Sequence, residues 1–184
     1  MELFEKHGQD NDVKPVEWRP WQYELLKYVN NPTSYGIIWV VGGEGNEGKS
    51  FFQAEVEKKY GKHRVCEMPL RETTRNLIGY MQKVVDTYIT DIFLFNVTGG
   101  GGRRTKRINY RILEKIKDGR VMAAVGNGVK RVRFTRPNVV MVFSNDYPNT
   151  GKFSRGRWLI FKINSEMQLK DVTEARLRKQ RDEV

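Results

Sequence analysis

The residues best suited to chemistry in this sequence lie between Gly43 and Ser50, which read Gly-Glu-Gly-Asn-Glu-Gly-Lys-Ser. This stretch, called the glycine loop below, matches the pattern GxxxxGK[ST] in full. Glycines let successive backbone N–H groups turn toward a phosphate, while the lysine supplies positive charge and the serine hydroxyl can bind magnesium. The sequence therefore predicts a loop that binds the phosphates of a nucleotide.

Each residue of the glycine loop has an expected role. Lys49 should reach the β and γ phosphates, and Ser50 should bind Mg²⁺. The residues expected to contact the nucleotide are Gly43, Glu44, Gly45, Asn46, Glu47, Gly48, Lys49, Ser50 and Phe51. The alternative is a glycine-rich turn that precedes Lys-Ser by coincidence, and the flanking elements argue against it.

The stretches on either side of the glycine loop give it the expected context. Residues 35–41 read YGIIWVV, and their β-branched and aromatic side chains favour a buried strand. Residues 51–60 favour a helix. A strand, a loop and a helix in this order are what the pattern requires, and the positive end of the helix dipole would then face the phosphates.

Composition narrows the classes of function. Lys and Arg number 33 against 22 Asp and Glu, so the formal net charge is +11, as expected for a protein with a nucleic-acid partner. Cys66 is the only cysteine, which excludes an internal disulfide or a thiolate metal cluster. With only His7 and His63, a zinc site is not expected. No stretch is apolar enough for a membrane span or a signal peptide, so we expect a soluble, intracellular protein.

The rest of the chain alternates between expected strands and helices. The sequence predicts strands at 63–68, 90–98, 139–145 and 157–163, helices at 18–29, 71–88, 108–117 and 171–184, and a hairpin at 120–134. This order favours an α/β fold with a parallel sheet. We expect an N-terminal lead-in and helical segment at 1–30, which could serve oligomerisation, one domain at 31–165, and a C-terminal helix at 166–184.

The carboxyl ends of parallel strands usually hold the ligand, and polar residues follow the expected strands there. Ser50 follows the first strand and its loop, Asn96 lies near the end of the strand at 90–98, and Asn145 ends the strand at 139–145. We expect the three to converge. Asn145 would hydrogen-bond the attacking water or the γ-phosphate, although an asparagine before Asp146 is also typical of a turn.

Five segments together resemble a known family. They are Trp21-Gln22, Gly45–Ser50, Tyr110–Gly119, Pro137–Asn145 and Phe153–Trp158. In this order they resemble the helicase half of the Rep replication initiators of circular single-stranded DNA viruses of eukaryotes, which are related to circoviruses and nanoviruses. The resemblance covers residues 19–163. It implies a superfamily 3 helicase of the AAA+ class: a P-loop NTPase with a five-stranded parallel sheet flanked by helices, a β-hairpin insertion and a short N-terminal helical segment.

The resemblance also implies a function. Members of the family are ATP-dependent DNA helicases that act in the host cell nucleus. They form a ring, usually a hexamer, and hydrolyse ATP with Mg²⁺ between neighbouring subunits while moving along single-stranded DNA. The origin-nicking endonuclease of the longer relatives is not expected here, because no pair of histidines flanks one residue and no Tyr-x-x-Lys follows.

Residue roles follow from the matching motifs. The glycine loop matches the phosphate loop of the family, and Asn145 matches its motif C asparagine. Phe153–Trp158 resembles a Ser-x-x-Arg-Trp element whose arginine can reach the neighbouring subunit's γ-phosphate. Arg157 fits that role best and Arg155 is the second choice, while both could instead be ordinary surface residues in so basic a protein.

Two positions depart from the family pattern. Relatives usually carry an aspartate where this chain has Asn96, whose amide can hold Mg²⁺ only through a bound water and lacks the charge that hard cations prefer. Asp91 is not expected to replace it, since it begins the strand and so lies at the opposite edge. The hairpin turn reads Gly-Asn-Gly where relatives often have lysine, so DNA contact is assigned to Lys130 and Arg131, unless they form a solvated face.

Three functions are therefore compared. The first is an ATP-driven DNA helicase motor of a viral rolling-circle replication initiator. The second is a ring or scaffold that binds ATP and nucleic acid but hydrolyses ATP slowly, as Asn96 suggests. The third is a small-molecule kinase, which the high positive charge disfavours. Stimulation of ATP hydrolysis by single-stranded DNA separates them, because only the motor requires it.

Overall fold

A computed structural model describes residues 16–33, 36–43, 45–69, 74–84, 89–97, 108–125, 128–134 and 137–182. The helices are α1 (Pro20–Asn30), α2 (Lys49–Tyr60), α3 (Thr74–Val84), α4 (Tyr110–Lys117) and α5 (Thr173–Asp182), with short 3-10 helices η2 (Thr150–Lys152) and η3 (Arg155–Arg157). The strands are β1 (Ile37–Val41), β2 (Val65–Pro69), β3 (Ile92–Asn96), β4 (Arg120–Val125), β5 (Gly128–Arg133), β6 (Val139–Ser144), β7 (Trp158–Ile163) and β8 (Leu169–Asp171).

The main sheet has six strands in the order β2-β3-β6-β1-β7-β8. The first five are parallel to their neighbours, as the sequence predicts. The expected number of strands was wrong by one, because β8 adds to the edge antiparallel to β7. Leu169–Asp171 has only three residues and one apolar side chain, so its sequence carries almost no strand signal. The sheet is therefore mixed rather than wholly parallel.

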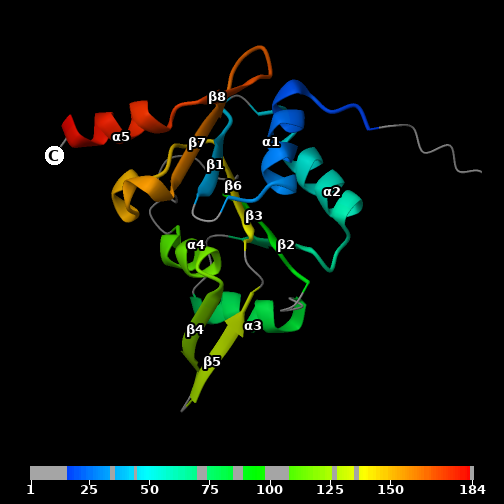
Figure 1. The fold of residues 1–184 in the computed structure, drawn as a ribbon, viewed down its shortest axis with the longest axis vertical. Helices are drawn as coiled ribbons and strands as arrows, with labels where there is room; N and C mark the ends of the chain where they lie inside the picture. The colour runs from blue at the N-terminus through cyan, green and yellow to red at the C-terminus, as the bar shows by residue number, and fades with distance from the viewer. Residues whose placement is uncertain are drawn as a thin grey trace, which may run out of the picture.

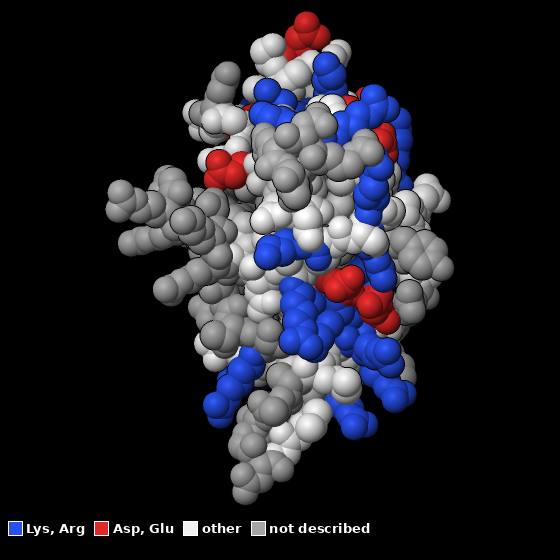
Figure 2. All heavy atoms as spheres, turned by 90° about the vertical axis from the view of Figure 1, so that its left-hand side faces the viewer, with Lys and Arg blue, Asp and Glu red and all other residues white. Residues whose placement is uncertain are grey.

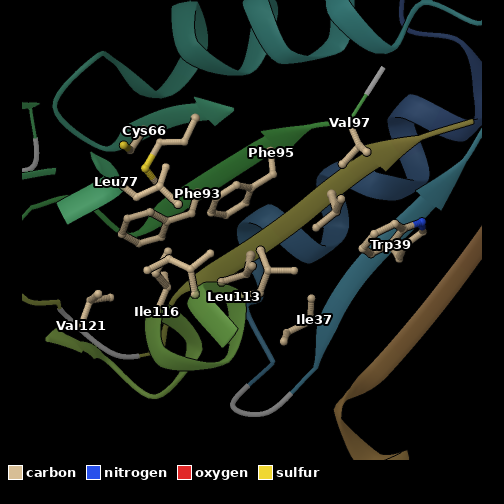
Figure 3. Close-up of a cluster of buried hydrophobic side chains, with 14 of the residues drawn as sticks. Ile37, Trp39, Cys66, Leu77, Phe93, Phe95, Val97, Leu113, Ile116 and Val121 are labelled. Atoms are coloured by element: carbon tan, nitrogen blue, oxygen red, sulfur yellow. The ribbon is translucent and has the colours of Figure 1, made fainter. Parts of the chain in front are cut away.

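Helices cover both faces of this sheet (Figure 1). Apolar side chains of α1 and α2 pack on one face, with Trp21 and Phe52 in that core. Side chains of α3, α4 and α5 pack on the other face, where Figure 3 shows Leu113 of α4 near Ile37 of β1 and Ile116 of α4 near Phe93 of β3. Because both faces are covered, all five residues of β1 are buried, which explains its uninterrupted apolar sequence.

Strands β4 and β5 form a separate antiparallel hairpin that extends away from the main sheet, at the bottom of Figure 1. Its base is anchored because Val121 and Val132 are buried in the core beneath α3 and α4. The register pairs Met122 with Arg131 and Arg120 with Arg133, so these four residues share one face. The predicted hairpin is confirmed, and its tip at residues 126–127 lies outside the described residues.

One expected helix is described only in part, and another begins later than expected. Residues 71–73 and 85–88 of the expected helix at 71–88 lie outside the described part, where α3 spans Thr74–Val84. The C-terminal helix begins at Thr173, after β8, rather than at the expected residue 171. The carboxylate of Asp171 accepts a hydrogen bond from the backbone N–H of Thr173 (2.9 Å), which stabilises the turn between strand and helix.

A buried lysine fixes the amino ends of two central strands. Lys117, at the end of α4, donates hydrogen bonds from Nζ to the backbone oxygens of Thr33 (2.7 Å) and Asn138 (2.5 Å). Thr33 precedes β1 and Asn138 precedes β6, so one ammonium group aligns the starts of both strands. Of the helices that the structure describes, none is long and apolar enough to cross a membrane.

Candidate functional site

The glycine loop connects the carboxyl end of β1 to the amino end of α2. Its backbone has positive φ angles at Gly45 (79°), Asn46 (57°) and Gly48 (83°), and α2 begins immediately afterwards at Lys49. Glycine adopts such angles without strain, whereas most residues do not. The strand, loop and helix expected from the pattern are therefore present, with the helix N-terminus at the lysine. Glu44 lies outside the described residues.

Lys49 lies between two oxygen atoms at this end of the sheet. Its Nζ is 3.1 Å from Oε2 of Glu47 and donates a hydrogen bond of 2.9 Å to Oδ1 of Asn145. The lysine is buried, with 7% of its surface exposed. A Cβ atom on Gly42 would lie only 2.4 Å from Nζ, so only glycine leaves space for this arrangement. The site thus has a fixed ammonium group beside a glycine-rich backbone.

Asn145 comes to this position because β6 is a direct neighbour of β1. It follows Ser144, the last residue of β6, and Gly42 donates its N–H to the backbone oxygen of Ser144 (2.9 Å). The structure therefore brings Asn145 next to the glycine loop, where its side chain is exposed. An exposed amide here can hydrogen-bond a phosphate oxygen or a water molecule.

Asn96, the last residue of β3, faces α2. Its Nδ2 is 3.4 Å from Oε1 of Gln53, which lies one turn beyond Ser50 on α2. Gln53 is buried, and its Nε2 has no hydrogen-bond partner among the described residues. Asp91 directly precedes β3 and so lies at the opposite end of this strand from Asn96, where it forms an ion pair of 2.7 Å with Arg64. The hydrogen bonds that Arg64 donates to the Asp91 carboxylate also raise the pKa of the Arg64 guanidinium.

Three side chains at the start of α1 hold the glycine loop through its carbonyl groups. The hydrogen bonds run from Arg19 Nη1 to Asn46 O (2.6 Å), from Trp21 Nε1 to Glu47 O (3.0 Å) and from Gln22 Nε2 to Gly48 O (3.0 Å). In a trans peptide the C=O and the following N–H point in opposite directions. The N–H groups of residues 47–49 therefore point away from α1, toward the side of the loop where they can donate hydrogen bonds to an anion.

The sequence did not identify this contact. Trp21-Gln22 entered the argument only as part of a resemblance, and the bond between Trp21 and Glu47 joins positions 26 residues apart. Periodicity marks Trp21 as a core residue, and it is fully buried against Phe52. The only local signal was an indole N–H, a group that needs a hydrogen-bond partner wherever it is buried.

The two arginines considered for contact with a neighbouring subunit lie in η3. Arg157 forms an ion pair of 2.5 Å with Asp118 at the end of α4, and 17% of its side chain is exposed. Arg155 lies 3.1 Å from Glu174 of α5, and 54% of its side chain is exposed. Both carry an intramolecular partner, and Arg155 is the more accessible of the two.

The hairpin carries the positive charge expected for nucleic-acid contact. Arg120, Arg131 and Arg133 are exposed on one face. Figure 2 shows Lys and Arg side chains gathered over the part of the surface that includes α4 and this hairpin, with few Asp and Glu. Burial and the nearby Arg111 lower the pKa of Lys115 on α4. The side chain of Lys130 lies outside the described part of the structure.

The donor set suits phosphate better than a metal bound by protein alone. Within the described ranges, no three His, Cys, Asp or Glu side chains lie close enough to hold a metal ion. Ser50 is exposed in the first turn of α2, and Asn96 supplies an amide, so Mg²⁺ would depend on the phosphate oxygens for most of its ligands. Phe51 is 47% exposed and contacts Trp18 edge to face.

Comparison with known proteins finds relatives of this chain among viral replication proteins. No family model matches it. It is 32% identical to Para-Rep C10 of the Milk vetch dwarf C10 alphasatellite, over 83% of this chain and 49% of that protein. It is 31% identical to Para-Rep C6 of the Subterranean clover stunt C6 alphasatellite, over 77% of this chain and 47% of that protein.

The chain is also similar, at lower identity, to a replication protein of a virus. The master replication protein of Subterranean clover stunt virus (strain F) is 26% identical over 78% of this chain and 46% of its own length. The chain therefore spans about half the length of the curated relatives it matches. Over most of its own length, this chain is a homologue of the Rep replication proteins of nanoviruses and their alphasatellites.

Proposed function

We propose that the chain is the ATP-dependent DNA helicase motor of a viral rolling-circle replication initiator. In this proposal the glycine loop binds the phosphates of ATP, Ser50 and a water held by Asn96 complete the ligands of Mg²⁺, and Asn145 positions the attacking water. The motor moves along single-stranded DNA as a homo-oligomeric ring, which we propose to be a hexamer, in the host cell nucleus.

The position of Lys49 carries this proposal. An ammonium group fixed at a helix N-terminus, beside peptide N–H groups that share one orientation, is a ready site for a phosphate chain. Asn145 lies within hydrogen-bond distance of the same ammonium. A group that bonds to Lys49 in this way is close enough to the terminal phosphate to orient a water molecule toward it.

Exposed arginines support the DNA partner. Arg131 and Arg133 lie on one face of a hairpin that extends from the body of the protein. Contacts from such side chains to DNA phosphates do not depend on base sequence, which suits a protein that moves along DNA. The names of the relatives refer to replication, which agrees with a DNA substrate for this chain.

A ring would place η3 of one subunit near the glycine loop of the next. Arg157 is the preferred arginine finger, meaning the arginine that reaches the γ-phosphate bound by the neighbouring subunit. Asp118 holds its guanidinium in one direction, which lowers the entropy lost when it binds a phosphate. Arg155 remains the alternative because its side chain is more exposed. An arginine that reaches the γ-phosphate from outside stabilises the charge that develops during its transfer.

The deciding experiment measures ATP hydrolysis by purified protein with and without single-stranded DNA, with the mass of the assembly determined in the same buffer. The proposal predicts a hydrolysis rate that rises with DNA and an assembly larger than one chain. A monomer with a DNA-independent rate would exclude a ring motor. Replacing Arg131 and Arg133 together with alanine should abolish stimulation by DNA and leave the basal rate unchanged.

A second candidate is a ring or scaffold that binds ATP and nucleic acid but hydrolyses ATP slowly. Asn96 favours it, since an amide near α2 attracts Mg²⁺ less strongly than a carboxylate. This candidate predicts ATP and DNA binding with a slow rate that DNA does not change. The same experiment therefore separates the two.

A further inference from the structure

The turn that carries Asn145 is held by side chains from elsewhere in the fold. Asn145 is exposed and directly follows β6, yet its Oδ1 lies 2.9 Å from Nζ of Lys49. The next residue is fixed at both backbone groups: Asp146 donates its N–H to Oγ of Ser144 (3.0 Å), and its oxygen accepts the indole N–H of Trp39 (3.0 Å). The direction of Asn145 therefore depends on what holds the residues after it.

Tyr147, the second residue after Asn145, is held from the C-terminal helix. The guanidinium of Arg176 on α5 lies over its ring, with Cζ 4.0 Å from the ring centroid. This distance is well within the range of a cation–π contact, which extends to about 6 Å. Tyr147 is half-buried and packs against the core on the α5 face of the sheet. Trp39 and Arg176 therefore hold two consecutive residues from two different elements.

The start of α5 is fixed to the strand beside β1. Val172 donates its N–H to the oxygen of Ile160 on β7 (2.9 Å), and the N–H of Ile160 donates to Oγ1 of Thr173 (2.8 Å). Ile160 is the register partner of Trp39 on β1. From this end α5 extends away from the sheet (Figure 1). The helix is therefore anchored beside the tryptophan that holds the same turn.

The inward position of Arg176 distinguishes it from other basic residues of α5. Arg178 and Lys179 on the same helix are exposed. Arg176 lies next to the buried Leu177, and its Nε atom is buried without a hydrogen-bond partner among the described residues. A buried donor without a partner is unfavourable. The attraction between the guanidinium and the Tyr147 ring offsets that cost, so this contact accounts for the position of the arginine.

We propose that Arg176 is a positioning residue, which acts through Tyr147 to fix the turn that directs Asn145 toward Lys49 and the attacking water. This inference rests on the proposed function, in which Asn145 orients that water. An exposed amide on an unsupported turn has several directions available, and misplacement of an orienting group by about 1 Å can reduce a rate about 100-fold. The C-terminal helix thereby becomes part of the machinery for hydrolysis.

The test compares steady-state ATP hydrolysis with Mg²⁺ by the unmodified protein and by variants on both sides of the contact. Arg176→Leu and Tyr147→Leu should each lower kcat about tenfold or more. The KM for ATP should change much less, because Lys49 and the glycine loop still hold the phosphates. Arg176→Lys keeps a cation and Tyr147→Phe keeps the ring, so both should retain most of the activity. Arg178→Leu removes the same charge from an exposed position on α5 and should have no effect.

The same substitution in a protein without Asn145 separates positioning from a purely structural role. If Arg176 acts through Asn145, Arg176→Leu should have no further effect on kcat in an Asn145→Ala protein. If Arg176 only anchors α5, the two losses should multiply, and that result would overturn the proposal. Unchanged kcat in both leucine variants would overturn it as well. Thermal unfolding shows whether each variant is folded, and Tyr147→Leu, which leaves the sequence of α5 intact, decides the matter if Arg176→Leu does not fold.

Binding of inorganic tripolyphosphate with Mg²⁺ separates failure of this inference from failure of the proposed function. A leucine variant that still binds tripolyphosphate has an intact glycine loop, so its lower kcat reports on positioning. If the unmodified protein hydrolyses ATP and the leucine variants do so at the full rate, the role of Arg176 alone is overturned. If the unmodified protein binds tripolyphosphate but hydrolyses no ATP, the proposed motor is excluded and this inference is overturned with it.

Discussion

Asn145 Oδ1 accepts a hydrogen bond of 2.9 Å from Nζ of Lys49, which joins the residue after β6 to the first residue of α2. The same ammonium is 3.1 Å from the carboxylate of Glu47, within the glycine loop. A phosphate that enters this site must therefore share Lys49 with two oxygens of the protein. A bound phosphate and these two side chains therefore compete for the Lys49 ammonium, so substitutions at Glu47 and Asn145 should change phosphate affinity.

Lys49→Ala should abolish nucleotide hydrolysis, because the ammonium neutralises phosphate charge during transfer, and loss of such a contact reduces turnover by about 100-fold or more. Lys49 also has a structural role, since it is buried and its removal breaks the ion pair with the buried Glu47. Breaking a buried pair in this way costs about 3 kcal/mol of stability.

A double variant separates these two effects. Lys49→Met with Glu47→Gln removes both charges, so the free energy of unfolding should recover while hydrolysis remains absent. Denaturant unfolding and an ATP hydrolysis assay measure the two quantities. Unchanged hydrolysis in a folded Lys49→Ala protein would exclude the assigned role of the lysine.

Glu47→Gln alone should strengthen the binding of phosphate. The amide keeps the shape of the side chain and can still accept a hydrogen bond, but it no longer competes as an anion for Lys49. We expect the dissociation constant for tripolyphosphate to fall about fivefold, which corresponds to roughly 1 kcal/mol. Glu55→Gln, on α2, is the control: it removes a carboxylate whose contact with the exposed Lys58 is 3.8 Å, and it should have no effect. Weaker binding in Glu47→Gln would contradict this account.

Asn96→Asp should raise turnover and shift half-saturation to lower Mg²⁺ concentration, because a carboxylate near α2 adds a charge that the hydrated ion prefers. It should not destabilise the protein, since Nε2 of Gln53 then gains an acceptor that it lacks among the described residues. Gln53→Leu combined with Asn96→Asp should be less stable than Asn96→Asp alone, because the new carboxylate then has no Gln53 amide to accept a hydrogen bond from.

The measurement for Asn96→Asp is the hydrolysis rate as a function of Mg²⁺ concentration, with thermal unfolding in parallel. DNA binding without nucleotide should barely change, because the hairpin lies elsewhere in the fold. If the aspartate variant is slower, or if its response to Mg²⁺ is unchanged, Asn96 does not occupy the position beside the metal ion.

Trp21→Phe should weaken nucleotide binding by about fivefold or more, because it leaves the Glu47 carbonyl without its indole donor and releases the peptide that this bond orients. The aromatic ring remains to pack against Phe52. Tyr23→Phe is the matched control, since Tyr23 is on the same helix but 63% exposed. The dissociation constant and the free energy of unfolding are measured together. A loss of stability with unchanged affinity would make Trp21 a core residue only.

ATP hydrolysis per chain should depend on protein concentration, because the finger proposed at Arg157 acts on a neighbouring subunit. Mixing Arg157→Ala with Lys49→Ala should restore part of the activity, since some interfaces then combine an intact loop with an intact finger. Repeating the mixture with Arg155→Ala identifies which arginine acts. A specific rate that is independent of concentration would exclude catalysis across an interface.

The sequence predicted the parts of the fold that depend on short, regular signals. Ile37–Val41 is apolar throughout, and the glycine loop has a fixed spacing, so their order and the parallel strands around them could be inferred. Asn145 was placed beside the loop because the ends of neighbouring parallel strands meet at one edge.

The parts that could not be predicted depend on distant partners. Nothing near Arg157 in the sequence identifies Asp118, and nothing near Glu47 identifies Trp21. The strand β8 was missed because three residues, two of them charged, do not produce a recognisable alternation. Its presence changes the surroundings of the site, since residues of β7 and β8 line a cavity beside the glycine loop.

The position of β1 in the sheet has a consequence for how the chain folds. Both of its neighbours come from far along the sequence: Ile38 pairs with Met141 of β6 and with Leu159 of β7. During synthesis this apolar strand emerges about 100 residues before either partner, so it stays unpaired until β6 and β7 have left the ribosome. Chains truncated before residue 139 should therefore aggregate through β1 rather than form a smaller stable domain.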